Sequence, residues 1–287
     1  MSTWEPLLSA LHASKYLTYQ PKEINDLYTL SKSFQESPGS VDEGTQYDLL
    51  RLHFHLALIT GDDVAAKTAL QRLRDRFGDE SSNIGILVGQ FLELTKGLKE
   101  AQDYLSSRPA TDYGAFKRKT VILKRTGNIP KFIEELLRYV GVCPTDYEAW
   151  AELAEAYYSI KHYARAMYCV EEVLVLCPQA YNMFARAGEI THVGATVASN
   201  VNDQIGELKV AAQHFCRAVE LSPNYIRGWC GVHVVCSKIV SFPKLSPQDS
   251  SKYQKLGDLA KSRLQEIYDS KAAPDKELEA AKLVLAK

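Results

Sequence analysis

The sequence predicts an all-α protein in which helix hairpins stack into a right-handed superhelical solenoid. Two observations support this prediction. The same residue types recur at intervals of 34 residues, because Tyr147 is followed by Tyr181 and Pro144 by Pro178. In addition, no strand-type alternation of apolar and polar residues recurs along the 287 residues. A period of 34 residues is typical of tetratricopeptide repeats, in which each unit buries its apolar face against its neighbours.

The clearest repeat spans 147–180. Its first helix is expected to pack through Trp150, Leu153, Ala154 and Tyr157, and its second through Ala166, Val170 and Val173, before Pro178. A large aromatic residue alternates with small ones in this pattern, so two antiparallel helices can approach closely. Proline cannot continue a helix, so it begins the link to the next unit.

The same register places the neighbouring units within one domain, 1–287. We expect degenerate hairpins over 1–112, repeats at 113–146, 147–180, 181–225 and 226–274, and a terminal helix over 275–287. The repeat at 181–225 is eleven residues longer than a 34-residue unit, because Pro223 follows Pro178 by 45 residues. Gly, Ser, Asn and Asp are frequent in 193–209, and 241–255 holds two prolines and four serines, so both stretches predict long loops.

The composition restricts the class of partner. Lys and Arg number 34 against 35 Asp and Glu, a formal net charge of -1. This balance disfavours nucleic acid, including an RNA-binding helical repeat, and offers no basic block for an anionic membrane surface. The N-terminus lacks a signal-peptide pattern, and the apolar runs are too short to cross a bilayer. The six cysteines form no Cys-x-x-Cys motif, so we expect reduced thiols in a cytosolic protein, with a disulfide framework as the weaker alternative.

No constellation of residues indicates catalysis, a cofactor or a metal, so we expect a protein that is not an enzyme. His53 and His55 suggest a metal site, but residues two apart on a helix point about 200° away from each other and cannot bind the same ion. The paired acids Glu134-Glu135 and Glu171-Glu172 are typical of solvated helix faces. No nucleotide-binding, zinc-protease or serine-hydrolase motif is present in the sequence.

The expected function is protein binding by the concave face. In tetratricopeptide arrays the first helices line this groove, and their non-packing positions face a ligand. The positions given by the register are Lys117, Lys124, Arg125, Glu148, Glu155, Tyr158, Asn182, Glu189, His192, Arg227 and Lys238. These residues predict a groove that is basic, then acidic, then mildly basic. Each single residue could equally serve only solubility, and Tyr158 could be a contact residue or filler.

One stretch, 146–178, resembles the family of subunit 2 of the ER membrane protein complex. Members of that family show a D-x-E-A-W-x-E-L-A-E-x-Y segment, present here at 146–157. A tyrosine-alanine step and a C/F-x-E-E segment follow, matched by Tyr163-Ala164 and Cys169-Val170-Glu171-Glu172. The family also has an insertion before a segment like 211–228. The match is specific over 146–236 and vague elsewhere.

The resemblance implies a cytosolic scaffold, peripheral on the cytosolic face of the ER membrane. It implies contact with the cytosolic parts of subunits 3 and 5, with subunit 1 and subunit 8/9 nearby. The assembly inserts tail-anchored and multipass proteins into the membrane. The alternative is a tetratricopeptide co-chaperone or adaptor that binds a peptide tail. Such a clamp keeps Lys or Arg at adjacent repeat positions, where this sequence has Glu155 and Glu189.

Overall fold

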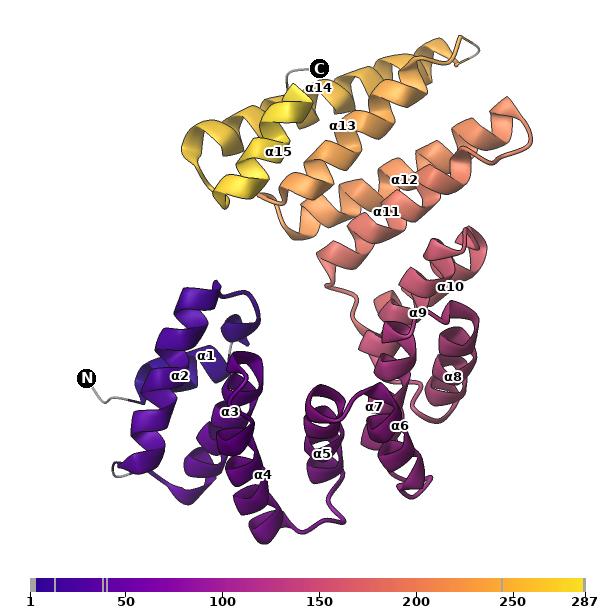
Figure 1. Ribbon diagram of the computed structural model, residues 1–287. Coiled ribbons are helices and arrows are strands. Elements are labelled where there is room, and N and C mark those ends of the chain that lie inside the picture. The colour runs from indigo at the N-terminus through magenta and orange to yellow at the C-terminus, as the bar shows by residue number, and fades with distance from the viewer. Residues whose placement is uncertain (1–3, 13, 38, 40, 244, 286–287) are drawn as a thin grey trace. The chain divides into compact units, whose positions relative to one another are not determined.

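The computed structural model describes residues 4–12, 14–37, 39, 41–243 and 245–285. Over these ranges the chain forms α-helices, one 3₁₀ turn (Lys15–Leu17) and connecting turns, and no strand (Figure 1). The all-α class predicted from the sequence is therefore confirmed. The helices are α1 (Glu5–His12), α2 (Pro21–Glu36), α3 (Glu43–Thr60), α4 (Asp63–Phe77), α5 (Ser82–Thr95), α6 (Leu98–Ser107), α7 (Tyr113–Arg125), α8 (Ile129–Val142), α9 (Tyr147–Ser159), α10 (Tyr163–Leu176), α11 (Tyr181–Ala195), α12 (Val201–Leu221), α13 (Ile226–Val240), α14 (Pro247–Ser270) and α15 (Asp275–Leu285).

The chain divides into two compact units, Met1–Phe132 and Ile133–Lys287. In the first unit α3 packs against α4 and α5 against α6. In the second unit α9 packs against α10, α11 against α12, and α13 against α14. Each of these pairs is a helix hairpin joined by a short connection (Figure 1). Both units therefore consist of the same kind of hairpin, and the single domain expected over 1–287 stays a prediction.

Helix α3 is the central helix of the first unit. One of its faces, which includes the fully buried Leu52, packs with apolar residues of α1 and α2. The other face, which includes the fully buried Phe54, packs with α4 and α5. A helix that is apolar on two faces shows no single stripe in its sequence. This is a physical reason why the repeat pattern is weak over α3.

In the second unit two tryptophans occupy equivalent places. The indole nitrogen of Trp150 donates to the carbonyl oxygen of Pro144 at 2.8 Å, and that of Trp229 donates to the carbonyl oxygen of Pro223 at 2.7 Å. Each bond joins two residues that are six apart, so the tryptophan has the same place in the repeat before and after the insertion. Tyr157 is buried, as predicted. Trp150, expected as a packing residue, is partly exposed, with an edge-on contact to the Tyr168 ring.

The two expected long loops are mostly helical. Between α11 and α12 only residues 196–200 lie outside helices, so the loop predicted over 193–209 is wrong for most of its length. Between α13 and α14 the described residues outside helices are 241–243 and 245–246, so the loop predicted over 241–255 is also wrong for most of its length. The reason is helix capping. The side chain of Asn200 accepts the amide of Asp203 at 2.9 Å, and Ser246 accepts that of Asp249 at 3.1 Å, so these polar residues begin long helices.

Candidate functional site

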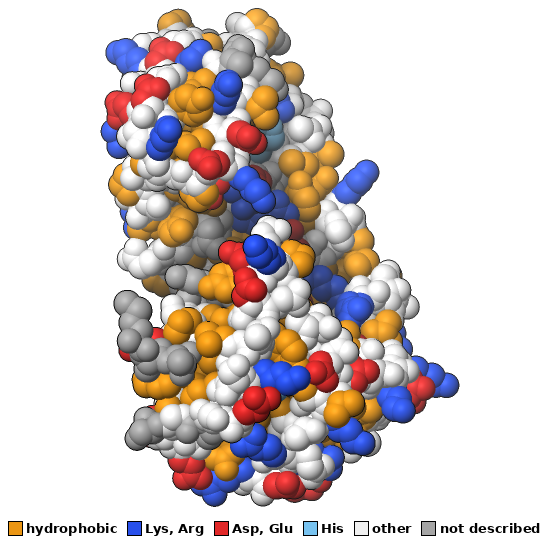
Figure 2. Space-filling model, turned by 60° about the vertical axis from the view of Figure 1, so that its left-hand side comes forward, with side chains coloured by type: hydrophobic (Ala, Val, Ile, Leu, Met, Phe, Trp, Pro, Cys, Tyr) orange, Lys and Arg blue, Asp and Glu red, His pale blue; other side chains and the backbone are white. Residues whose placement is uncertain are grey.

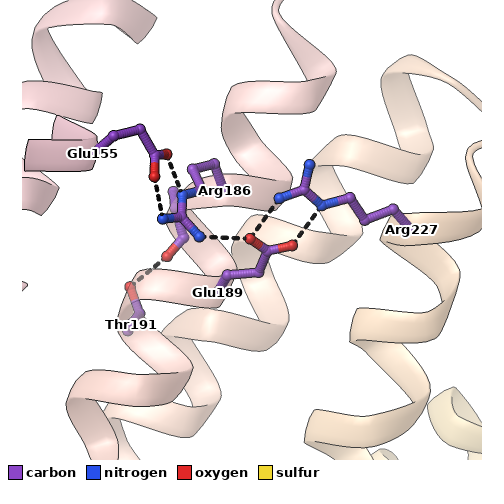
Figure 3. A network of polar contacts seen from close by, with 6 residues as sticks. Glu155, Arg186, Glu189, Thr191 and Arg227 are labelled. Atoms are coloured by element: carbon purple, nitrogen blue, oxygen red, sulfur yellow. Dashed lines mark hydrogen bonds and ion pairs between the residues drawn. The ribbon is translucent and has the colours of Figure 1, made fainter. Parts of the chain in front are cut away.

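Four charged side chains connect the first helices of three successive hairpins in the second unit (Figure 3). Glu155 lies on α9, Arg186 and Glu189 on α11, and Arg227 on α13. Arg186 donates Nε and Nη2 to the two oxygens of Glu155 at 2.6 and 2.7 Å. Arg227 donates Nε and Nη2 to the two oxygens of Glu189 at 2.5 and 2.6 Å. Arg186 also donates Nη1 to Glu189 at 2.9 Å, so the four residues form one continuous network.

The electrostatics of the network are those of satisfied ion pairs. Burial alone would raise the pKa of Glu189, but the hydrogen bonds from Arg227 and Arg186 outweigh burial and hold the pKa below its ordinary value. The hydrogen bonds to Glu189 likewise raise the pKa of Arg227. The guanidinium of Arg186 lies 4.1 Å from the centre of the Tyr158 ring, which adds a cation–π contact. These four residues and Tyr158 therefore fix each other's positions.

A pocket of about 370 Å³ lies beside this network, on the face formed by the first helices. Its polar edge contains Tyr158, Arg186, Glu189, His192 and Arg227, and its apolar surface contains Val193, Phe215, Cys230, Gly231, Val234 and Val235. The apolar residues come mainly from α13, with the Phe215 ring contributed by α12. Val234 is 46% exposed, so this apolar surface is open to a partner.

Two glycines allow the Phe215 ring to reach this pocket. A β-carbon at Gly231 would lie 2.3 Å from one edge of the ring, and a β-carbon at Gly188 would lie 2.8 Å from the opposite edge. The backbones of α11 and α13 therefore approach the ring more closely than any side chain would allow. This close approach explains why Phe215 is only 3% exposed while still lining the pocket.

The second unit brings several of the predicted site residues together. Glu155, Glu189 and Arg227 form the network, while Tyr158 and His192 line the pocket beside it. Burial, and then the nearby charge of Lys238, lowers the pKa of His192. Two predicted residues, Glu148 and Asn182, are exposed near the starts of α9 and α11 and do not line this pocket.

Sequence reasoning missed Arg186, which is the centre of the network. It follows Glu155 by 31 residues and precedes Glu189 by three, a spacing at which side chains on one helix meet. A search for a cation three or four residues from each predicted acid would have found it. Glu155 and Glu189, two residues of the expected acidic section, are both paired with arginines, and the acidic section of the groove stays a prediction.

The first unit contains three of the predicted residues, all on α7, whereas Lys238 lies on α13 in the second unit and does not line the pocket. Arg125 pairs with Glu93 of α5, which also pairs with Arg118 and is itself only 5% exposed. Lys124 lies over the ring of Phe132 at 5.9 Å, and Lys117 is partly exposed. Arg125 therefore holds a buried carboxylate between α5 and α7, a structural task that the sequence did not reveal. Figure 2 shows Lys and Arg interspersed with Asp and Glu over the visible face.

The described residues contain no group of three or more side chains placed to hold a metal ion. His53 contacts the hydroxyl of Ser31 at 2.9 Å and stacks on Tyr28. His55 instead lines a pocket that His53 does not reach. The two histidines thus point apart, as their spacing predicts. Burial, followed by the charges of Arg51 and Arg118, lowers the pKa of His55 to about 4, so the ring is neutral at pH 7.

All six cysteines are free. Burial raises the thiol pKa to about 12 for Cys169 and Cys236 and to about 11 for Cys230. The thiolate is the reactive form of cysteine, so these three thiols are poor nucleophiles at neutral pH. None of the described helices combines the length and the apolar composition needed to span a bilayer.

The family model and several relatives that match this chain point to one family. The EMC2 TPR-like repeat domain matches residues 93–203. The TPR repeat protein oca3 of Schizosaccharomyces pombe is 34% identical over 227 residues, which cover 78% of this chain and 77% of that protein. ER membrane protein complex subunit 2 of Saccharomyces cerevisiae is 26% identical over 296 residues, which cover 99% of this chain and 97% of that protein. The subunit of that name from Xenopus tropicalis is 28% identical over 215 residues, covering 74% and 69% of the two chains.

A solved structure supports the fold. The C-terminal part of a TPR repeat-containing protein from Cytophaga hutchinsonii matches 93% of this chain and 96% of its own length, with a TM-score of 0.52 and 13% identity. Likeness at so low an identity speaks for the fold alone. Together with the matching repeat domain, it confirms the tetratricopeptide class that the 34-residue period predicts.

Proposed function

This chain belongs to the ER membrane protein complex subunit 2 family, and on that premise we propose that it is a non-catalytic scaffold subunit of the ER membrane protein complex. It sits peripherally on the cytosolic face of the ER membrane and organises the cytosolic parts of membrane subunits. The assembly then inserts tail-anchored and multipass proteins. The printed names of the relatives from yeast, Xenopus and Dictyostelium support membership of the complex.

The observation that carries the binding role is the pocket on the first-helix face of the second unit. Its volume of about 370 Å³ falls in the range of sites that enclose a ligand group, and most of its surface is apolar. The neighbouring charges already satisfy one another through the Glu155–Arg186–Glu189–Arg227 network. A partner therefore gains mainly from apolar contact with Val193, Cys230 and Val234, which are accessible at the pocket surface and suit a hydrophobic side chain of another protein.

Recovery of the complex tests this proposal. The tagged full chain is purified from detergent-solubilised ER membranes, and the proteins that accompany it are identified by mass spectrometry. Val234→Glu places a charge in the pocket, and we expect it to reduce recovery of the membrane subunits. Val210→Glu is the matched control, because Val210 is 41% exposed on α12 and does not line the pocket. Far-UV circular dichroism verifies that both variants are folded.

Three outcomes separate the possibilities. Loss of membrane subunits with Val234→Glu but not with Val210→Glu supports both the scaffold role and the pocket. Equal recovery of the membrane subunits with both variants would show that the pocket does not contact them. Recovery of chaperones with no membrane subunit by the unsubstituted chain refutes the scaffold role and favours the peptide-tail adaptor. The ion pairs argue against such an adaptor, since Arg186 and Arg227 are both engaged by glutamates and a carboxylate clamp needs available cations.

A further inference from the structure

A second groove lies within the second unit, on a different side of α11. Its volume is about 750 Å³, and it shares no lining residue with the pocket described above. Helix α11 contributes Glu189, His192 and Val193 to the first site, and Ile190, Thr191 and Gly194 to the second. The remaining wall comes from α10 and from the segment that begins α12. A partner in one site therefore leaves the other site open.

The insertion in the repeat at 181–225 builds one wall of this groove. Val197, Ala198, Ser199, Asp203 and Glu207 all line it, and all fall within 193–209. Because Asn200 caps α12 at its first turn, the extra residues form an ordered helical extension. A mobile loop at this place could not present Asp203 and Glu207 on one helical face, four residues apart. The insertion thus creates a surface that a standard repeat lacks.

The groove has an acidic edge. Glu171 of α10 and Asp203 and Glu207 of α12 line it, and no lysine or arginine does. Within the described part of the chain none of these three carboxylates takes part in an ion pair, although Asp203 accepts the side-chain amide of Asn200 at 2.6 Å. All three residues are exposed. This contrasts with Glu155 and Glu189, whose charges are balanced by arginines.

The same groove exposes apolar surface next to the acids. Val197 is 68% exposed and Tyr168 is 55% exposed, and the partly exposed Met167 also lines the groove. Lysine and arginine side chains combine an aliphatic stem with a terminal charge, so they can cover such apolar surface while reaching a carboxylate. The Tyr168 ring can also receive a cation over its face. The chemistry of the groove is thus complementary to a segment that is both basic and aliphatic.

We propose that this groove docks a basic, aliphatic segment of a protein partner. Lysine or arginine side chains of the segment pair with Glu171, Asp203 and Glu207, and its aliphatic residues cover Val197 and the Tyr168 ring. This site is separate from the pocket that supports the scaffold role, and neither depends on the other. An anionic lipid surface does not fit the groove, since the three carboxylates would repel it.

The test measures binding of a fluorescent probe to the full chain by anisotropy. The probe is a short peptide of leucine and lysine, arranged so that the leucines fall on one face of a helix. The lining variant is Glu171→Gln, Asp203→Asn and Glu207→Gln combined, which removes the charges and keeps the shapes. The matched control, Asp258→Asn, Glu266→Gln and Asp269→Asn combined, removes three charges from α14 in the same unit. Circular dichroism verifies that both variants are folded.

We expect saturable binding that the lining variant weakens about tenfold, corresponding to about 1.4 kcal/mol, while the control variant changes Kd less than about twofold. Val197→Ser should weaken binding as well, because the contact is partly apolar. Equal weakening by the lining and control variants would mean general attraction to an acidic protein, and would overturn the proposal. Equal binding of a peptide with glutamate in place of lysine, or the absence of saturable binding, would also overturn it.

Discussion

The close approach of Gly231 to the Phe215 ring predicts how much stability Gly231→Ala should cost. The new β-carbon would lie 2.3 Å from the Phe215 ring, well inside the normal carbon–carbon separation of about 3.5–4.0 Å. The ring cannot move away, because Gly188 lies against its opposite edge, where a β-carbon would be 2.8 Å away. Alanine gains about 1 kcal/mol over glycine inside a helix, but overpacking a rigid ring costs about 3 kcal/mol. The expected net loss is about 2 kcal/mol.

Thermal unfolding followed by circular dichroism measures this loss. For a unit of this size, 2 kcal/mol corresponds to a fall in Tm of about 4–8 °C. Gly206→Ala is the matched control, since Gly206 lies inside α12 with nothing within 4 Å of the added carbon. That variant should gain about 0.5–1 kcal/mol from helix propensity alone. The two glycine substitutions are thus expected to shift Tm in opposite directions.

The result that refutes this reasoning is a rise in Tm with Gly231→Ala similar to that with Gly206→Ala. Such a rise would show that α12 and α13 are not in contact at the Phe215 ring. A double variant, Gly231→Ala with Phe215→Leu, provides a further check. The smaller side chain relieves the clash, so the double variant should lose less stability than the sum of the two single variants.

Three other predictions follow from burial and pairing. Glu189→Gln should cost about 1 kcal/mol of unfolding free energy near neutral pH. Because the folded-state pKa of Glu189 is depressed, its stabilisation is present above the unfolded value near 4.5 and is lost as pH falls through the lower folded value. Urea titrations should therefore show a larger loss of stability at acidic pH in the wild type than in the variant. Trp229→Ala should lower the free energy of unfolding, measured with urea, by about 3–5 kcal/mol, and Trp150→Ala should lower it clearly less. The reason is burial, because Trp229 is 8% exposed whereas Trp150 is partly exposed. Equal losses would contradict this difference. Cys169 and Cys236, whose thiol pKa values are raised to about 12, should remain unlabelled by maleimide at pH 7.5 until the chain is unfolded, and labelling in the native state would show that α10 and α13 open readily.

The sequence was informative wherever one residue type had one structural use. Spacing the prolines at 34 and 45 residues located the insertion, and the bonds from Trp150 and Trp229 to the carbonyls six residues before them confirm that register. The family resemblance at 146–178 is also confirmed. Small residues such as Ala166 are buried where the repeat pattern places them.

Sequence reasoning failed where one residue type has two uses. Asn200 and Ser246 are typical of loops, but both also begin helices, and the structure uses them as caps. Trp150 matches the aromatic position of the repeat, yet it is partly exposed. The extent of its burial depends on which side chains pack against it in the fold, and the repeat pattern does not specify them. The site residues that remained hidden, such as Phe215 and Gly231, depend on three helices approaching one ring, and no local pattern encodes that approach.

The acidic residues show most clearly why a charge pattern alone cannot locate a binding site. Glu155 and Glu171 look alike in sequence, and Glu171 reads as part of a solvated helix face. In the fold Glu155 is held by Arg186, whereas Glu171 lies at a groove edge with no ion pair among the described residues. A paired carboxylate has little to offer a basic partner, because binding would first have to break the existing pair. Available charge is therefore a property of the tertiary structure, and it places the basic-segment site on the insertion side of α11 and the apolar site beside the ion-pair network.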